Sequence, residues 1–239
     1  HRMKNPKFIP FSLLTIGMAL AISVPLPVLG PQSVQAAEIA YKPTVTTAPV
    51  RRVGAGSRGL CKEVSSVDNT FTLQVLAPAT IGQTISAQPT LYWSVSKPLS
   101  GKFTFTVVED SKDFVDPVLD TKVAQSVTGV QALSLAKYQV SLKKGASYKW
   151  SVSLECDANN PSLNIVSSGM IKYVEPSASL DQANPEKLPF LYAAKGYWYD
   201  ALSSLSDLIQ ANPTEKKWHE ERASLVKQGG LDKLATLDK

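Results

Sequence analysis

Residues 148–156 read YKWSVSLEC, and this stretch decides the fold. Apolar side chains stand at every second position and polar ones between them: Tyr148, Trp150, Val152 and Leu154 alternate with Lys149, Ser151 and Ser153. A period of two belongs to a β-strand with one face in a core and the other in water. Because strands of a parallel sheet are apolar on both faces, this pattern favours an antiparallel sheet.

The same period recurs on both sides of this stretch. It is present at 71–75, 91–95, 103–107 and 165–174, with shorter candidates at 133–135 and 140–142. Gly, Pro and Asn separate these six or seven segments, which is typical of an antiparallel sandwich or barrel. We therefore predict a mainly β protein with a C-terminal α segment. Its β domain, residues 54–176, is expected to be an antiparallel immunoglobulin-like β-sandwich of about seven strands.

The apolar spacing changes from two to three and four after Pro176. It includes Leu188, Leu191 and Tyr192, then Trp198, Leu202, Leu205 and Ile209, and then Trp218, Ala223, Leu225 and Val226. Pro213 ends one predicted helix and Gly229 ends the next. A helical hairpin is therefore expected over residues 177–239.

Three adjacent aromatic residues, Tyr197, Trp198 and Tyr199, begin the longest helical stretch. Neighbouring side chains on a helix lie about 100° apart, so the three rings cannot all face one core. At least one must be exposed, or be covered by the β domain or a partner. One interpretation is a hairpin packed on the sandwich. The functional hypothesis is that these three residues bind a protein partner.

The first 36 residues have the features of a signal peptide. Lys4 and Lys7 precede an apolar run at 8–29, and small residues follow at 34–37, VQAA. A positive start, an apolar middle and a small-residue exit are the parts of a secretory signal, so we expect cleavage after Ala36. An uncleaved anchor is the alternative, although prolines interrupt the apolar run. Export to the periplasm or the exterior follows, with residues 37–53 as an extended Pro/Thr-rich linker.

The charge of the chain is concentrated in that first segment. The formal charge is +5, from 25 Lys and Arg against 20 Asp and Glu. Three of the basic residues and none of the acidic ones lie within residues 1–36, so the remainder carries only +2. This small excess gives no support to a nucleic-acid-binding protein.

Two cysteines are present in the chain. Cys156 has the same parity as Trp150 and should point into the core, and Cys61 lies just before the first clear strand. In an exported protein two buried thiols most often form a disulfide, which here would close a loop of about 95 residues. A reactive thiol, the alternative, would need an activating neighbour.

Catalytic and cofactor signals are weak. After the predicted signal peptide the only histidine is His219, among charged neighbours on a helix, so neither a Ser-His-Asp triad nor a zinc site is expected. Residues 54–59, GAGSRG, match G-x-G-x-x-G but follow a Pro-rich stretch rather than a strand, so no dinucleotide or other cofactor is expected.

One dense group of carboxylates follows the strand at 103–107. Its members are Glu109, Asp110, Asp113, Asp116 and Asp120. A solvated loop is the plain interpretation of this group. Calcium binding or a carboxylate-based hydrolase is the alternative, and the hydrolase would lose its activity, without losing stability, when Asp113 or Asp116 is changed to Asn.

Several of these segments together resemble the DUF928 family of exported bacterial proteins, found especially in cyanobacteria. The resemblance covers about residues 54–235 and includes GAGSRG with Cys61, LAP at 76–78, PTLYW from Pro89, YKWSVSLEC and WYDAL from Trp198. Leu60 departs from the family pattern, in which a second glycine is common. The resemblance implies paired cysteines at Cys61 and Cys156, but no assigned function and no catalytic residues.

The sequence thus predicts a non-enzymatic, disulfide-stapled envelope protein whose helical hairpin binds a protein partner. A cell-wall or glycan-binding module is the second hypothesis, with Tyr92 as the only clear aromatic candidate on a sheet face. The hydrolase is the third. No metal and no stable membrane insertion after signal cleavage are expected.

Overall fold

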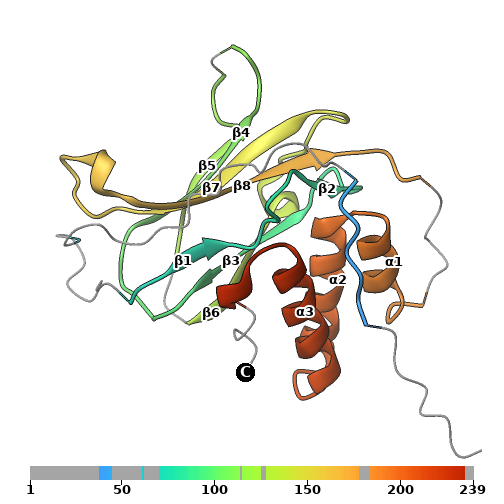
Figure 1. Ribbon diagram of the computed structural model, residues 1–239. Helices are drawn as coiled ribbons and strands as arrows, with labels where there is room; N and C mark the ends of the chain where they lie inside the picture. Colours follow the sequence, from blue (N-terminus) through green and yellow to red (C-terminus); the bar gives the residue numbers. More distant parts are fainter. Residues whose placement is uncertain are drawn as a thin grey trace, which may run out of the picture. The chain divides into compact units, whose positions relative to one another are not determined.

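The structure is a computed structural model, and it describes residues 38–44, 61, 70–113, 115–124, 128–177 and 184–234 (Figure 1). The predicted signal peptide, the glycine-rich turn at 54–59 and most of the predicted linker lie outside these ranges. Residues 37–239 form one compact unit. Among the described residues, no helix combines the length and the apolar character that crossing a membrane requires.

Within the described residues, eight strands form two sheets. The first sheet has the order β1 (Leu73–Val75), β3 (Thr90–Val95), β6 (Gly129–Ser134). The second has the order β2 (Gly82–Thr84), β8 (Ile165–Tyr173), β7 (Ser147–Leu154), β4 (Phe103–Glu109), β5 (Leu119–Val123). The mainly β prediction is confirmed at this level.

The prediction of a wholly antiparallel arrangement is wrong at one edge. β2 runs parallel to β8, with Gly82 opposite Ile171, whereas the other described strand pairs are antiparallel. β2 has only three residues and no row of apolar side chains, so the sequence carried no signal for it. The candidate strand at 140–142 is instead part of the connection before β7, where Leu142 is buried.

A row of aromatic rings joins the two sheets. Trp93 of β3 lies 5.7 Å from Phe105 of β4, and Phe105 lies 5.7 Å from Trp150 of β7, measured between ring centroids. Trp93 belongs to the first sheet and the other two rings to the second. The period of two in β7 therefore places Trp150 in the shared core, as predicted.

In the described part of the C-terminal segment, 184–234, three α-helices follow the strands, where a hairpin of two was expected. They are α1 (Leu188–Ala194), α2 (Trp198–Ala211) and α3 (Lys216–Gln228), and short 3-10 helices lie at Leu135–Tyr138, Pro161–Leu163 and Asp232–Leu234. Gly196, with φ of +81°, separates α1 from α2 because a left-handed residue ends helical geometry. The correction concerns the number of helices, and the C-terminal helical segment itself is confirmed.

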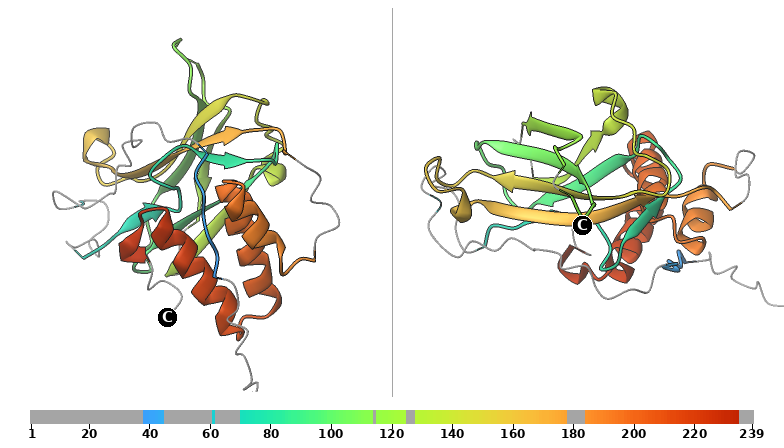
Figure 2. Two further views of the ribbon diagram at one scale, coloured as in Figure 1. Left: turned by 45° about the vertical axis from the view of Figure 1, so that its right-hand side comes forward. Right: turned by 90° about the horizontal axis from the view of Figure 1, so that it is seen from above.

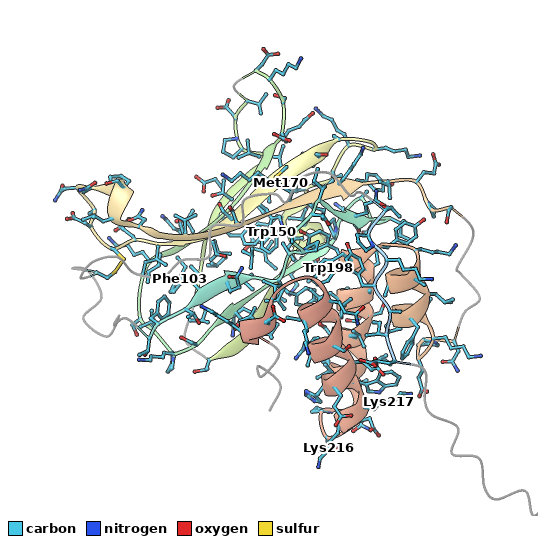
Figure 3. All side chains as sticks on the ribbon, viewed as in Figure 1. Phe103, Trp150, Met170, Trp198, Lys216 and Lys217 are labelled. Atoms are coloured by element: carbon cyan, nitrogen blue, oxygen red, sulfur yellow. A yellow bond between two sulfur atoms is a disulfide. The ribbon has the colours of Figure 1, made fainter. Side chains whose placement is uncertain are left out.

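The helices cover the connection between β1 and β2. The indole nitrogen of Trp198 donates to the carbonyl of Leu76 at 2.9 Å, and the amide of Ala79 donates to the carbonyl of Gly229 at 3.0 Å. A Cβ placed on Gly229 would stand 2.2 Å from the Trp198 ring, so only glycine fits there. Figure 3 shows Trp198 and Trp150 where the sheets meet the helices.

Residues 38–44, the described part of the predicted extended linker at 37–53, pack against the helices. This segment, here called the strap, runs extended along the helices (Figure 2). Ile39 is only 2% exposed, its amide donates to Glu221 Oε2 at 2.8 Å, and the amide of Lys42 donates to the carbonyl of Ala193 at 3.0 Å. The strap has no apolar period because it is a single extended segment that buries few side chains.

Tyr199 provides the first prediction. Its hydroxyl accepts from Trp150 Nε1 at 2.9 Å and donates to the carbonyl of Met170 at 2.8 Å. Tyr199→Phe leaves both groups buried without that partner, so we expect unfolding in urea to require about 1–3 kcal/mol less free energy. Tyr138→Phe, at a side chain that is 41% exposed, is the matched control and should change little. Equal stability of the two variants would contradict this role of the Tyr199 hydroxyl.

Candidate functional site

The three aromatic residues proposed to bind a partner are buried inside the chain. Tyr197 is 4% exposed, Trp198 0% and Tyr199 1%. The prediction that they form a partner-binding surface is therefore wrong, and the alternative that the chain itself covers them holds.

Each ring meets a different part of the chain, as the 100° step between neighbours requires. Tyr199 bonds with the second sheet, as described above. The Trp198 ring packs edge-on against Tyr41 of the strap at 5.0 Å, and the Tyr197 hydroxyl accepts from the amide of Ser177 at 2.9 Å. The inference that the three rings must face different surroundings was correct, but the elements that cover them lie far apart in the sequence.

Tyr92 does not provide a glycan-binding platform. It is 6% exposed, and its hydroxyl donates to Ser203 Oγ at 3.3 Å. The outer face of β3 is covered by α2 at this position, since Ser203 belongs to that helix. The glycan hypothesis therefore loses the residue on which it rested.

The carboxylates at 109–120 are not gathered into a common site. Glu109 forms an ion pair with Lys143 at 2.8 Å, and Asp120 accepts from Thr106 Oγ1 at 3.2 Å. Asp113 and Asp116 are exposed in the β4–β5 loop. Within the described ranges, no group of three or more His, Cys, Asp or Glu side chains could hold a metal ion.

Asp200 is a residue that the sequence reasoning missed, although it follows the three aromatic residues directly. Its carboxylate accepts from the amide of Ile85 at 3.1 Å and from Thr84 Oγ1 at 3.2 Å, and so ties the start of α2 to the end of β2. Burial raises the pKa of this carboxyl to about 6, against the lowering effect of these two hydrogen bonds.

A different region has the features of a binding surface: the β5–β6 flank, formed by β5, β6 and the turn Leu135–Tyr138. β5 and β6 are edge strands of the two sheets. The end of β5 and the second half of β6 line one cavity of about 270 Å³, with Trp93 among its lining residues. An adjoining cavity of about 370 Å³ continues past β5 to Phe103.

The backbone of β6 presents hydrogen-bonding groups along this flank. The carbonyl of Tyr92 accepts from Leu76 on the β1 side, so the backbone groups of Tyr92 point away from β6. Ala132, its partner in the register, is therefore a position whose N–H and C=O point away from β3, toward a sheet edge with which no described strand pairs. Such an edge is a template for another extended segment.

The side chains around the cavity combine apolar and basic character. Tyr138 is 41% exposed, and Lys122 and Lys137 line the cavity with it. Lys122 Nζ donates to Thr104 Oγ1 at 2.8 Å, so its alkyl chain lies along the rim while its ammonium lies on the outer face of the sheet. The flank thus combines two edge strands, an exposed aromatic ring and two lysine side chains, and this combination is typical of a surface that binds another molecule.

The predicted disulfide is present. Cys61 and Cys156 are bonded, with their Cα atoms 4.4 Å apart and 95 positions apart in the sequence. The bond ties the segment before β1 to the end of β7, so both cysteines have a structural partner. No reactive thiol remains among the cysteines, since the chain has only these two.

The disulfide leads to a prediction about stability. Closure of a loop of this length limits the unfolded chain and is worth about 4–5 kcal/mol at most. A Cys61→Ser/Cys156→Ser variant should therefore unfold at lower urea concentration by a large part of that amount. Reduction of the unaltered protein should raise its mass by about 2 Da and lower its stability to that of the variant. A reductant that leaves the urea midpoint unchanged would contradict this.

Asp200 leads to a prediction about pH. Because the pKa of Asp200 is about 6 in the folded protein and the ordinary value of an aspartate is 3.8, the folded state binds more protons between these values, and stability falls as the pH rises through that window. The unaltered protein should lose up to about 3 kcal/mol between pH 4 and pH 7 from this group. Asp200→Asn keeps an acceptor for Ile85 and can donate to Thr84, so its stability should fall less over this range, by the part that Asp200 contributes.

The measurement is urea unfolding at several pH values, with Asp110→Asn as the control at an exposed carboxylate. Asp200→Asn should match the unaltered protein near pH 4 and exceed it at pH 7.5. Parallel pH curves for the two proteins would overturn the assignment of this dependence to Asp200.

The comparisons with known proteins agree with the resemblance found in the sequence. The family described as a Domain of Unknown Function, DUF928, matches residues 53–238. A search of curated proteins finds no match to the chain. The family match takes in both sheets, the two cysteines and the three helices, and so covers most of the sequence. This chain therefore belongs to the DUF928 family.

Proposed function

We propose that this protein is a non-enzymatic, exported binding module of the cell envelope that holds an extended segment of a partner protein at the β5–β6 flank. The observation that carries the proposal is the pair of edge strands lining one cavity, with Ala132 presenting its backbone groups outward. Strand addition at an exposed sheet edge is a recurring way for one protein to hold another. Export is supported by the signal-like segment at 1–36, and a disulfide is compatible with an oxidising compartment.

The fold supports this assignment of the flank. We propose that the sandwich is immunoglobulin-like, with β1, β3 and β6 as strands A, B and E and with β8, β7, β4 and β5 as strands G, F, C and C′. The extra strand β2 lies beside β8, on the side that the helices cover. The flank between strands C′ and E is then the side of the sandwich that carries no additional strand.

We therefore assign partner binding to the β-sandwich and not to the helices. The helical segment contributes Trp198 and Tyr199 to the core, and so it supports the β domain rather than acting as a separate docking arm. A chain ending near Glu175 would expose this core. It therefore cannot separate binding from folding, and point changes on the flank are the appropriate test.

The test is site-specific photo-crosslinking in the native envelope. A photoreactive amino acid at Lys137, next to β6, should form an adduct with one partner protein, and the same group at Lys216 should not. Lys216 lies at the start of α3, at the end of the helices remote from the sheets (Figure 3). Ala132→Pro removes the outward N–H and keeps the β3 ladder, so it should lower the Lys137 adduct at least tenfold.

Circular dichroism of Ala132→Pro checks that the sandwich is retained. An adduct at Lys137 that is unaffected by Ala132→Pro would contradict strand addition. An adduct that forms equally at Lys216 would contradict the flank as the binding surface.

A glycan is the second candidate ligand for the same flank. The observation that favours it is Tyr138, an exposed ring beside the polar side chains of Gln131 and Ser134. A glycan would depend on this ring rather than on the backbone of β6. Retention of envelope polysaccharide that is lost in Tyr138→Ala and kept in Ala132→Pro would support the glycan over the protein.

A further inference from the structure

The strap is held to the helices by a set of contacts that resembles the binding of a peptide ligand. Four backbone groups of the strap are engaged. The Ile39 amide donates to Glu221 and its carbonyl accepts from Gln228 Nε2 at 2.7 Å, while the Tyr41 amide donates to Gln228 Oε1 at 2.8 Å. The fourth is the Lys42 amide, which donates to Ala193. Backbone recognition of this kind gives affinity for an extended segment.

Two side chains of the strap supply anchors. Ile39 is buried, and Tyr41 packs its ring edge-on against Trp198. Burial raises the pKa of Tyr41 to about 12, in agreement with a phenol packed against the helices. A side-chain bond from Ser224 Oγ to Glu38 Oε1, 2.9 Å, closes the strap at its beginning. The strap-binding surface is thus Ala193, Trp198, Glu221, Ser224 and Gln228.

The strap lies far from this surface in the sequence, since Ile39 and Glu221 are more than 180 positions apart. Between the strap and Cys61 lie the 16 residues 45–60, whose contour reaches about 55 Å when extended. The same contacts can therefore form within one chain or between two, and such exchange of an identical element is a low-cost route to a dimer.

We propose that the surface formed by Ala193, Trp198, Glu221, Ser224 and Gln228 is a peptide-binding site that accepts the strap of a second copy of this chain, so that two copies associate by exchanging residues 38–44. The occupant is identified by the strap itself, which is seated on this surface with all four backbone bonds in place. The strap within the same chain competes at a millimolar effective concentration. Exchange is therefore expected to rise with protein concentration and to dominate where copies are crowded together. This inference is independent of the β5–β6 flank.

The experiment traps the exchange with cysteines on otherwise unaltered chains. One chain carries Glu38→Cys and the other Ser224→Cys, because these two side chains lie in contact. The two chains, with different affinity tags, are mixed at concentrations from 10 µM to 1 mM and oxidised mildly. A disulfide-linked heterodimer should form, with a yield that rises with concentration. A third chain with Ser111→Cys, in the β4–β5 loop, gives the background of random collision.

Ile39→Asp in the Glu38→Cys chain removes the buried anchor and should reduce the heterodimer at least tenfold. The site itself is tested with a labelled peptide of residues 37–44 and the full chain carrying Ile39→Asp. Fluorescence anisotropy should show saturable binding, weakened at least tenfold when the peptide also carries Asp at that position.

The outcomes separate clearly. Heterodimer above the Ser111→Cys background, lost with Ile39→Asp, supports exchange. Heterodimer only at background, whether or not the peptide binds, overturns exchange between copies. A peptide that fails to bind a chain whose circular dichroism is native overturns the peptide-binding site as well.

Discussion

The hydroxyl of Tyr199 is the contact on which the rest of this structure depends. Trp150 lies at the centre of the sandwich. Burying its indole N–H in an aromatic core costs free energy unless a hydrogen-bond acceptor lies within reach. Neither sheet supplies that acceptor: it comes from α2, more than forty positions later in the chain. The same hydroxyl satisfies the carbonyl of Met170 in β8. The β-sandwich therefore completes its core with a side chain from the helical segment.

This dependence explains why the helices pack so closely on the β1–β2 connection. A Cβ at Gly82 would stand 2.6 Å from the Tyr199 ring, so β2 has a glycine where the ring approaches. Asp200, the next residue of α2, then fixes the start of that helix to Thr84 and Ile85. Short, polar β2 is held between β8 on one side and α2 on the other. Its parallel direction follows from this position rather than from any preference in its own three residues.

The sequence predicted the strands in which apolar residues recur with a period of two. It did not predict the elements whose position depends on a few individual contacts. β3, β4 and β7 were predicted because each places apolar side chains on one face over six residues or more. β2 and β5 were not, since one is three residues long and the other is a half-exposed edge. The cysteine pair followed from parity and export. The strap carried no pattern because it buries one aliphatic side chain and bonds through its backbone.

The aromatic triplet shows how a correct physical premise led to a wrong site. Three neighbouring rings cannot share one core, but a folded chain can offer three separate covers. The sequence does not state that the strap and Ser177 will be two of them. Once these covers are in place, none of the three rings is exposed. Within the described residues, the exposed ring beside an edge strand is Tyr138.

The distribution of covered and open edges then restricts where a partner can bind. Helices and strap occupy the side of the sandwich that carries β1 and β2, because the core needs Trp198 and Tyr199 there. No comparable requirement exists at β5 and β6: the inward-facing Leu119, Thr121 and Val123 of β5 remain half-exposed, although Leu133 of β6 is buried. A sheet edge left in this state favours aggregation unless something covers it. The physical cost of the open edge is thus itself an argument that the β5–β6 flank is occupied when the protein functions.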